Sequence, residues 1–176
     1  MEGDVKDLKL YIRDVPNFPK PGIIFRDITP LLADGEALHE VIDRLSQPYR
    51  GRIDMVLGIE SRGFLFGAAV AYALSAGLAV VRKPGKLPAQ TYAAQYALEY
   101  GRDALEIHRD AFGHPTRVLI VDDLLATGGT AQATAKLAES LGAQIAGLGF
   151  VVELEFLKGR EKLKNYDVMS LLRYDK

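Results

Sequence analysis

The chain has 176 residues, no cysteine, 48% hydrophobic residues, 26% charged residues and a formal net charge of -1. This length and composition predict one domain, spanning residues 1–176, with a hydrophobic core. The lack of cysteine excludes disulfides, thiolate catalysis and cysteine-bound metal, and the near-zero charge gives no support for nucleic-acid binding.

The amino-terminal segment, MEGDVKDLKL, is polar and lacks the apolar core of a signal peptide. No apolar run approaches the roughly 20 residues that a membrane-spanning helix needs. We therefore expect a cytoplasmic protein that makes no contact with membranes.

The first predicted element is a short helix starting at residues 8–12, followed by an irregular, proline-rich arm over residues 15–30. Apolar residues then recur with helical spacing and predict an amphipathic helix, which Asp34 would cap at its amino-terminal end. The apolar positions of this helix are Leu38, Val41, Ile42 and Leu45.

The next elements are a strand, a helix and a second strand. The run Met55–Ile59 is apolar and predicts a buried strand, and a helix with Gly77 at its end follows it. The apolar face of that helix comprises Leu65, Ala68, Ala69 and Tyr72. A strand is predicted at residues 78–81, and residues 83–100 hold two possible strand fragments among glycine, proline and small polar residues.

The last predicted strands are residues 118–121 and 145–152, separated by a helix that Gly142 would end. One face of this helix comprises Thr134, Leu137, Ala138 and Leu141. Strands that alternate with helices predict an α/β domain with a parallel sheet covered on both faces. Ligands of such sheets bind beyond the carboxyl ends of the strands, where Glu60 and Asp122 both fall.

The most informative stretch runs from residue 118 to residue 134, with the sequence VLIVDDLLATGGTAQAT. After the strand come Asp122 and Asp123, and then a loop of small residues, which consists of Ala126, Thr127, Gly128, Gly129 and Thr130. Free N–H groups at the start of a helix bind anions, and glycine lets the backbone approach a phosphate closely. Carboxylates repel phosphate but suit sugar hydroxyls or a metal. The combination predicts a site for a ribose 5-phosphate.

Other phosphate motifs do not account for this stretch. The chain contains no GxxxxGK[ST] motif, and no GxGxxG motif follows a strand. A receiver-like α/β protein also carries an acidic pair after a strand, but that alternative leaves the TGGT segment unexplained.

Two further clusters carry charge near predicted turns. In GIESRG, residues 58–63, Arg62 stands at a helix start and could reach a diphosphate, although a surface arginine beside a turn is the plainer alternative. In RKPGKLP, Arg82, Lys83 and Lys86 suit a clamp for a polyanion or a solvated charged loop.

The stretch VLIVDDLLATGGT resembles the phosphoribosyl-diphosphate signature of the type I phosphoribosyltransferases. Ala126 stands where the 6-oxopurine members of that family carry a third aspartate, so LLATGGT is similar to the adenine branch. The resemblance extends from about residue 15 to residue 172, including LKGREKL at residues 157–163. It implies a central, mostly parallel sheet flanked by helices, a flexible loop, and a small hood built from about residues 1–33 and the carboxyl-terminal segment.

The resemblance also implies an activity. A purine salvage transferase of this kind converts adenine and 5-phosphoribosyl 1-diphosphate, called the donor below, to AMP and diphosphate. The expected cofactor is Mg²⁺ chelated by the donor rather than by the protein, and the expected assembly is a homodimer. Two alternatives remain open. One is a phosphoribosyltransferase for another base, and the other is a non-catalytic regulator that binds the donor.

The family assigns roles to the charged clusters. Glu60, Ser61 and Arg62 would form the diphosphate loop, with a cis peptide bond between the first two. Arg82, Lys83 and Lys86 would belong to a loop that covers the reacting centre and excludes water.

The resemblance assigns the purine proton to Glu99 of the LEYG segment. This assignment is chemically sensible, because Ala126 leaves the phosphate loop without an acid and another carboxylate should supply one. From chemistry alone, Glu99 would pass for an exposed carboxylate.

The expected adenine site comes from the segment PGIIFRDITP, residues 21–30. In the family, Phe25 would stack on the purine and the backbone of Ile24 and Arg26 would pair with its N1 and 6-amino groups, while Leu154 closes the other face. The residue pattern alone would favour Phe25 as an ordinary core aromatic.

Overall fold

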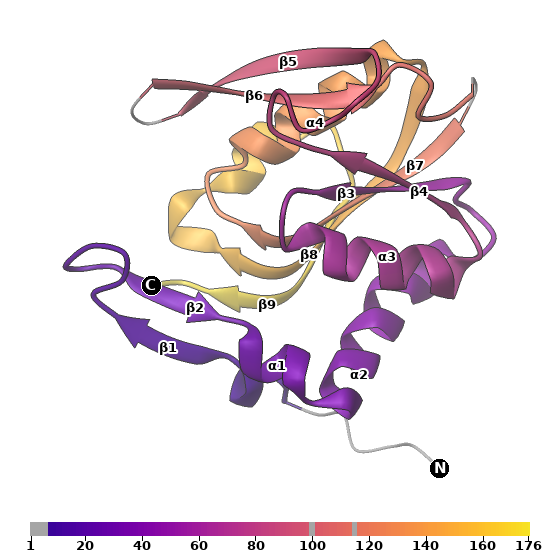
Figure 1. Ribbon diagram of the computed structural model, residues 1–176. Coiled ribbons are helices and arrows are strands. Elements are labelled where there is room, and N and C mark those ends of the chain that lie inside the picture. Colours follow the sequence, from indigo (N-terminus) through magenta and orange to yellow (C-terminus); the bar gives the residue numbers. More distant parts are fainter. Residues whose placement is uncertain (1–6, 99–100, 114–115) are drawn as a thin grey trace.

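The computed structural model describes residues 7–98, 101–113 and 116–176. In this part of the chain a five-stranded, wholly parallel sheet has the strand order β4-β3-β7-β8-β9 (Figure 1). Its strands are β3 (Met55–Ile59), β4 (Gly77–Val81), β7 (Thr116–Leu125), β8 (Ala143–Leu154) and β9 (Val168–Tyr174). The predicted fold class is therefore confirmed.

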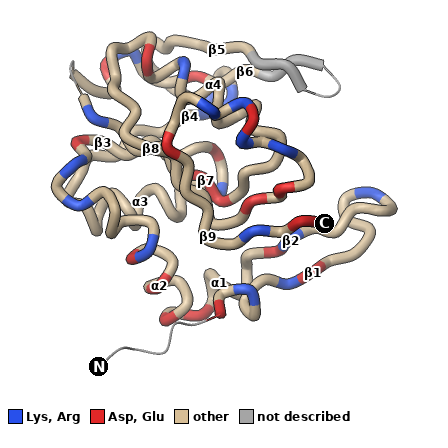
Figure 2. The backbone as a smooth tube through the Cα atoms, turned by 180° about the vertical axis from the view of Figure 1, so that it is seen from behind, with Lys and Arg blue, Asp and Glu red and all other residues tan. Residues whose placement is uncertain are grey.

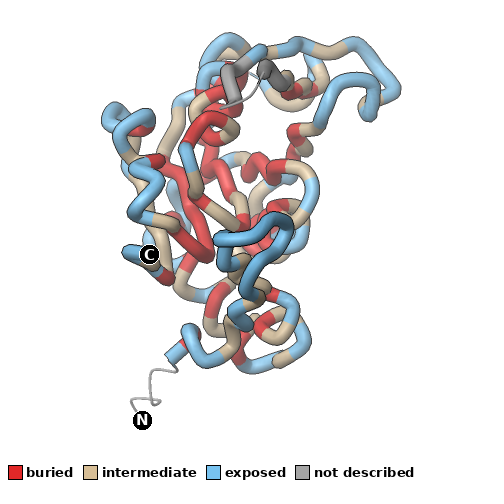
Figure 3. The backbone as a smooth tube through the Cα atoms, turned by 90° about the vertical axis from the view of Figure 1, so that its left-hand side faces the viewer, coloured by how far each residue is buried: buried red, intermediate tan, exposed pale blue. Residues whose placement is uncertain are grey.

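Helices cover both faces of the sheet. The buried residues gather in the interior of the molecule (Figure 3), and among the strands of the sheet β3, β7 and β8 are the most buried. One face packs against α1 (Thr29–Ala33), α2 (Gly35–Ser46) and α3 (Gly63–Leu74). The other packs against α4 (Gly129–Ser140) and a hairpin of β5 (Thr91–Leu98) and β6 (Gly101–His108). The alternation is visible within β7, where Ile120 belongs to one core and Leu119 to the other.

Short helical turns complete the described elements. They are η1 (Leu8–Tyr11), η2 (Gln47–Tyr49), η3 (Glu155–Leu157) and η4 (Gly159–Leu163). Lysine and arginine are interspersed with aspartate and glutamate along the chain (Figure 2), in keeping with the net charge of -1. In the described residues no helix is both long and apolar enough to cross a membrane.

Helix α2 forms as its sequence predicts. The Asp34 carboxylate accepts a hydrogen bond of 2.8 Å from the backbone N–H of Ala37, which caps the helix. Val41 and Leu45 are buried against the sheet. The cap and the apolar spacing therefore agree with the tertiary structure.

The predicted face of α3 is wrong. Phe66 and Val70 are buried, whereas Leu65 is 52% exposed and Tyr72 is 89% exposed. The helix is apolar on all sides, so its periodicity does not reveal which side meets the sheet. The helix also ends earlier than expected, at a left-handed Ser75, and Gly77 is the first residue of β4.

The arm predicted as irregular contains a hairpin instead. Strands β1 (Arg13–Pro16) and β2 (Ile24–Asp27) pair antiparallel, and α1 then follows. The Arg13 guanidinium pairs with the Asp27 carboxylate across the strands at 2.7 Å, and such opposite charges stabilise a ladder. Proline does not prevent this pairing, because Pro16 occupies the end of a strand.

Two strand predictions also need correction, and one strand was missed. The two fragments expected within residues 83–100 are a single strand, β5. Strand β7 continues past residue 121 to Leu125, so Asp122 lies within it and not beyond it. Strand β9 was not predicted, and it forms the edge of the sheet beside β8.

Candidate active site

The predicted phosphate loop connects β7 to α4. Gly128 has a φ of +76° and caps the helix, whose first residue is Gly129. Because α4 has twelve residues, its amino-terminal N–H groups and dipole favour an anion at this end. A small cavity at this position is lined by Asp122 and by residues 124–131. The five predicted loop residues are thus brought together around one cavity.

A second glycine packs against this loop. A Cβ atom added to Gly128 would collide with the carbonyl oxygen of Gly159, and a Cβ added to Gly159 would collide with the carbonyl oxygen of Ala126. The side-chain amide of Gln132 also donates a hydrogen bond of 3.0 Å to the carbonyl of Lys162. The loop therefore rests on the backbone of η4, a contact that the sequence did not indicate.

The acidic pair lies beside the loop. Asp122 Oδ1 accepts a hydrogen bond of 2.9 Å from the backbone N–H of Asp123, whose own Oδ2 lies 2.6 Å from Arg62 Nε. Burial, followed by the charge of Asp123, raises the pKa of Asp122 well above its ordinary value. Gly63 is required here, because a Cβ would lie 2.7 Å from Asp122 Oδ1. The site therefore disfavours the negative charge of Asp122, whereas Asp123 is paired with Arg62.

Replacing Asp122 by asparagine is expected to stabilise the fold and to lower turnover. The raised pKa means that the folded chain prefers the neutral side chain, so the ionised form reduces stability at pH 7. Asparagine keeps the hydrogen bond from Asp123 without the charge. The stability advantage over wild type should be largest at neutral pH and should vanish below the ordinary pKa of 3.8.

Urea unfolding of wild type and Asp122→Asn from pH 3 to 8 measures the change in stability. Steady-state kinetics of the transfer reaction expected from the family resemblance measure the change in turnover. Asp123→Asn is the comparison: it also relieves the repulsion of Asp122, but it removes the partner of Arg62, so it should stabilise the fold less than Asp122→Asn and should lower turnover. We expect at least one variant to lose charge-assisted hydrogen bonds of about 1.5–3 kcal/mol. Unchanged kinetics in both would return the pair to a structural role.

Arg62 joins the acidic pair to the hairpin. Its guanidinium carbon lies 5.4 Å from the ring centre of Phe25, and its Nε contacts Asp123. A larger cavity of about 380 Å³ is lined by Glu60, Ser61, Arg62, Asp122, Asp123, Leu124, Ala126 and Thr130. The predicted diphosphate loop, acidic pair and phosphate loop thus share one cavity.

The predicted cis peptide bond between Glu60 and Ser61 is present. The Glu60 carboxylate receives a hydrogen bond of 2.7 Å from the backbone N–H of Lys83 and lies 3.0 Å from the Arg82 guanidinium. Burial opposes ionisation of Glu60, but these hydrogen bonds prevail and lower its pKa. Arg82 also donates to the Lys86 carbonyl at 3.2 Å, so the predicted basic cluster is attached to the diphosphate loop.

The predicted base-binding residues lie on the hairpin and at the end of β8. Phe25 is partly exposed and meets Phe18 edge to face, with ring centres 5.3 Å apart, so it is not part of the main core. Ile24, on β2, is about half exposed. Arg26 donates to the carboxyl-terminal Lys176 carbonyl at 2.7 Å. Its guanidinium carbon also lies 4.1 Å from the ring centre of Tyr174.

Leu154 is the last residue of β8 and pairs in register with Tyr174 of β9. Tyr174 is also the residue that the Arg26 side chain covers. The carboxyl-terminal strand therefore connects Leu154 to the hairpin. Glu99, the predicted acid, lies outside the described residues.

The matches to known proteins agree with this geometry. Residues 29–173 match the phosphoribosyl transferase domain. The chain is 60% identical over 171 residues to the adenine phosphoribosyltransferase of Solibacter usitatus, covering 97% of this chain and 99% of that protein. Fold, loop and acidic pair together therefore define a phosphoribosyl transferase.

Similar solved structures show to which group of phosphoribosyl transferases the chain belongs. The adenine phosphoribosyltransferase of Thermoanaerobacter pseudethanolicus superposes with a TM-score of 0.93 at 52% identity, covering 97% of this chain and 100% of that one. The Saccharomyces cerevisiae enzyme, solved with adenine and an iminoaltritol bisphosphate, has a TM-score of 0.90 at 44% identity, covering 96% and 98%. The chain belongs to the adenine phosphoribosyltransferases. The predicted family and enzyme class are confirmed.

Proposed function

We propose that this site transfers the 5-phosphoribosyl group of the donor to adenine, giving AMP and diphosphate. One observation carries the proposal: the start of α4, the acidic pair and Arg62 line two cavities that share lining residues, and Arg62 contacts the aromatic hairpin. The loop of residues 126–130 would hold the 5-phosphate, and Asp122 and Asp123 would orient the ribose hydroxyls.

The diphosphate would lie against Ser61 and Arg62, with Arg82, Lys83 and Lys86 closing over it. Glu60 cannot attract an anion, and its contacts with Arg82 and Lys83 make it the residue that positions the basic cluster. As the bond from C1 of the ribose to diphosphate breaks, N9 of adenine bonds to C1, diphosphate leaves, and the purine proton passes to Glu99, the carboxylate to which the resemblance assigns it. Exclusion of water by the basic segment protects the cationic sugar from hydrolysis.

Mg²⁺ fits this site as part of the donor complex. Carboxylate and hydroxyl oxygens are the ligands that this hard cation prefers, and the acidic pair stands beside the place proposed for the ribose hydroxyls. The donor's own diphosphate and ribose oxygens would hold the ion, which offsets charge on the leaving group. Asp122 and Asp123 would orient those hydroxyls.

The hairpin β1–β2 and the carboxyl-terminal strand would form the hood over the base. Phe25 offers a ring for stacking, the backbone of Ile24 and Arg26 offers donors and acceptors, and Leu154 offers an apolar contact. A backbone site matched to the 6-amino group leaves polar groups unpaired when it meets a 6-oxo group. Adenine should therefore be favoured over hypoxanthine.

A homodimer is part of the proposal. Tyr72 and Leu65 leave an apolar surface of α3 exposed, and a groove beside it is lined by Leu38 and Ile42 of α2 together with Tyr72. Exposed apolar surfaces of this kind commonly mark protein interfaces. A second copy would cover this surface.

The test is a screen of free bases with the donor and Mg²⁺, in which the nucleotide formed is measured. We expect AMP from adenine, and little or no nucleotide from hypoxanthine, guanine or uracil. Preference for another base would retain phosphoribosyl transfer and overturn the adenine assignment. Donor binding without transfer to any base would favour a regulator.

A further inference from the structure

A buried carboxylate lies between the phosphate loop and the proposed base site, and the reaction described above does not use it. Glu153 is 2% exposed, although it lies on β8 directly before Leu154. In the sheet register it pairs with Leu125 on one side, the residue before the phosphate loop, and with Arg173 on the other. A carboxylate this deeply buried needs partners.

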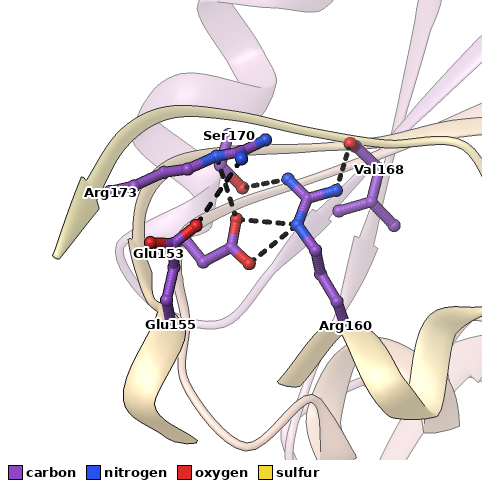
Figure 4. Close-up of polar contacts among 6 residues, drawn as sticks. All are labelled: Glu153, Glu155, Arg160, Val168, Ser170 and Arg173. Atoms are coloured by element: carbon purple, nitrogen blue, oxygen red, sulfur yellow. Dashed lines mark hydrogen bonds and ion pairs between the residues drawn. The ribbon is translucent and has the colours of Figure 1, made fainter. Parts of the chain in front are cut away.

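Arg160 supplies the main partnership (Figure 4). Its Nε donates to both carboxylate oxygens of Glu153, at 2.8 and 3.0 Å, while its other nitrogens donate to the Val168 carbonyl at 2.8 Å and to Ser170 Oγ at 3.4 Å. Burial opposes the charge on Glu153, but the hydrogen bonds of Arg160 and Ser170 prevail and lower its pKa. Arg160 thus connects η4 to both β8 and β9.

Arg160 directly follows Gly159, the residue against which the phosphate loop packs. The space between Gly159 and the loop is too small for a methyl group on either side. A shift of η4 would therefore move the carbonyl of Gly159 relative to Gly128 and Ala126. The fork geometry of arginine is suited to preventing such a shift, because several directed hydrogen bonds fix one orientation.

We propose that Arg160 is a positioning residue for donor binding: its ion pair with Glu153 holds Gly159 against the phosphate loop and so shapes the cup for the 5-phosphate. The inference rests on the proposed function of that loop. It assigns Arg160 no contact with substrate. The effect should appear in donor affinity and should not appear in the affinity for adenine.

The experiment measures donor binding by calorimetry in the presence of Mg²⁺ and the absence of base, and then KM for donor and for adenine. For Arg160→Gln we expect the donor Kd and KM to rise roughly tenfold to a hundredfold, since small misplacements of binding groups have effects of that size. KM for adenine should stay within about twofold, because the contacts that hold the hairpin, Arg26 with Lys176 and Phe18 with Phe25, do not involve Arg160.

Two variants make the result specific. Arg173→Gln is the matched control, because Arg173 lies 3.7 Å from the same carboxylate but is not in η4, and its donor affinity should remain unchanged. Arg160→Lys keeps the charge but loses the fork, so it should fold and give an intermediate donor affinity. If Arg160→Gln does not fold, the donor affinity of Arg160→Lys tests the proposal.

The outcomes separate this inference from the proposed function. Lower stability with unchanged donor affinity in Arg160→Lys and Arg160→Gln would make the network purely structural and overturn the inference. Equal losses in Arg173→Gln would also overturn it. If the wild type binds donor but does not use adenine, the proposed function fails and the donor affinities of the variants still test the inference. If the wild type does not bind donor, both fail.

Discussion

Replacing Gly128 by valine is expected to reduce donor binding more than a hundredfold. The φ of +76° at this position is strained for any residue with a Cβ, and the new side chain would collide with the Gly159 carbonyl. Relief of that collision must move the loop whose N–H groups face the proposed phosphate. Loss of two charge-assisted hydrogen bonds, at about 1.5–3 kcal/mol each, accounts for the size of the effect.

Calorimetric titration with the donor measures the loss, and urea unfolding at the same temperature measures the accompanying change in stability. Gly35→Val is the matched control, because Gly35 has open space around it and lies on α2. We expect Gly128→Val to weaken the free energy of donor binding by far more than it lowers the free energy of unfolding. Normal binding by Gly128→Val would show that the 5-phosphate lies elsewhere.

Replacing Glu99 by alanine is expected to lower kcat by roughly 10²–10⁴-fold, the contribution of a positioned acid or base. The expectation rests on Ala126, which leaves the phosphate loop without an acid, and on the similarity of LEYG to the family pattern. Donor binding should be largely retained, since the residues proposed to bind the donor lie on other segments.

Steady-state kinetics on adenine and hypoxanthine, for wild type and variant, separate catalysis from base selection. Adenine should remain preferred in Glu99→Ala, because selection is proposed to come from the hairpin backbone. Glu36→Ala, which removes a carboxylate from the first turn of α2, controls for the loss of one charge. Full kcat in Glu99→Ala would exclude Glu99 from the mechanism.

The local order of residues was sufficient to predict the strand, turn and helix start on which the candidate site is built. The sequence of apolar strand, Asp122 and Asp123, and small loop residues specifies a strand, a turn and a helix start within one stretch of chain. Neighbours in sequence remain neighbours in space there, so the cup around residues 126–130 follows from its own residues. The cap at Asp34 was predictable for the same reason.

Contacts between distant segments were beyond such reasoning. The residue pattern alone suggested that Phe25 is a core aromatic residue, and only the fold shows that Arg62 lies beside its ring. The exposed face of α3 could not be chosen, because every side of that helix is apolar and burial depends on where the sheet lies. The ion pair of Arg13 and Asp27 across β1 and β2 likewise forms only when the arm folds back on itself.

What the sequence determined by itself is therefore the family and the local arrangement of the candidate site, that is, the glycine-containing turn at a helix start and the acidic pair before it, each encoded in adjacent residues. What only the tertiary structure decided is how segments distant in the sequence hold these residues in place. Gly159 meets Gly128, and Arg160 meets Glu153, because η4 folds back over the carboxyl ends of β7 and β8. The physical reason is that close packing and charge burial are properties of the folded chain, whereas turn and helix-start preferences belong to local sequence.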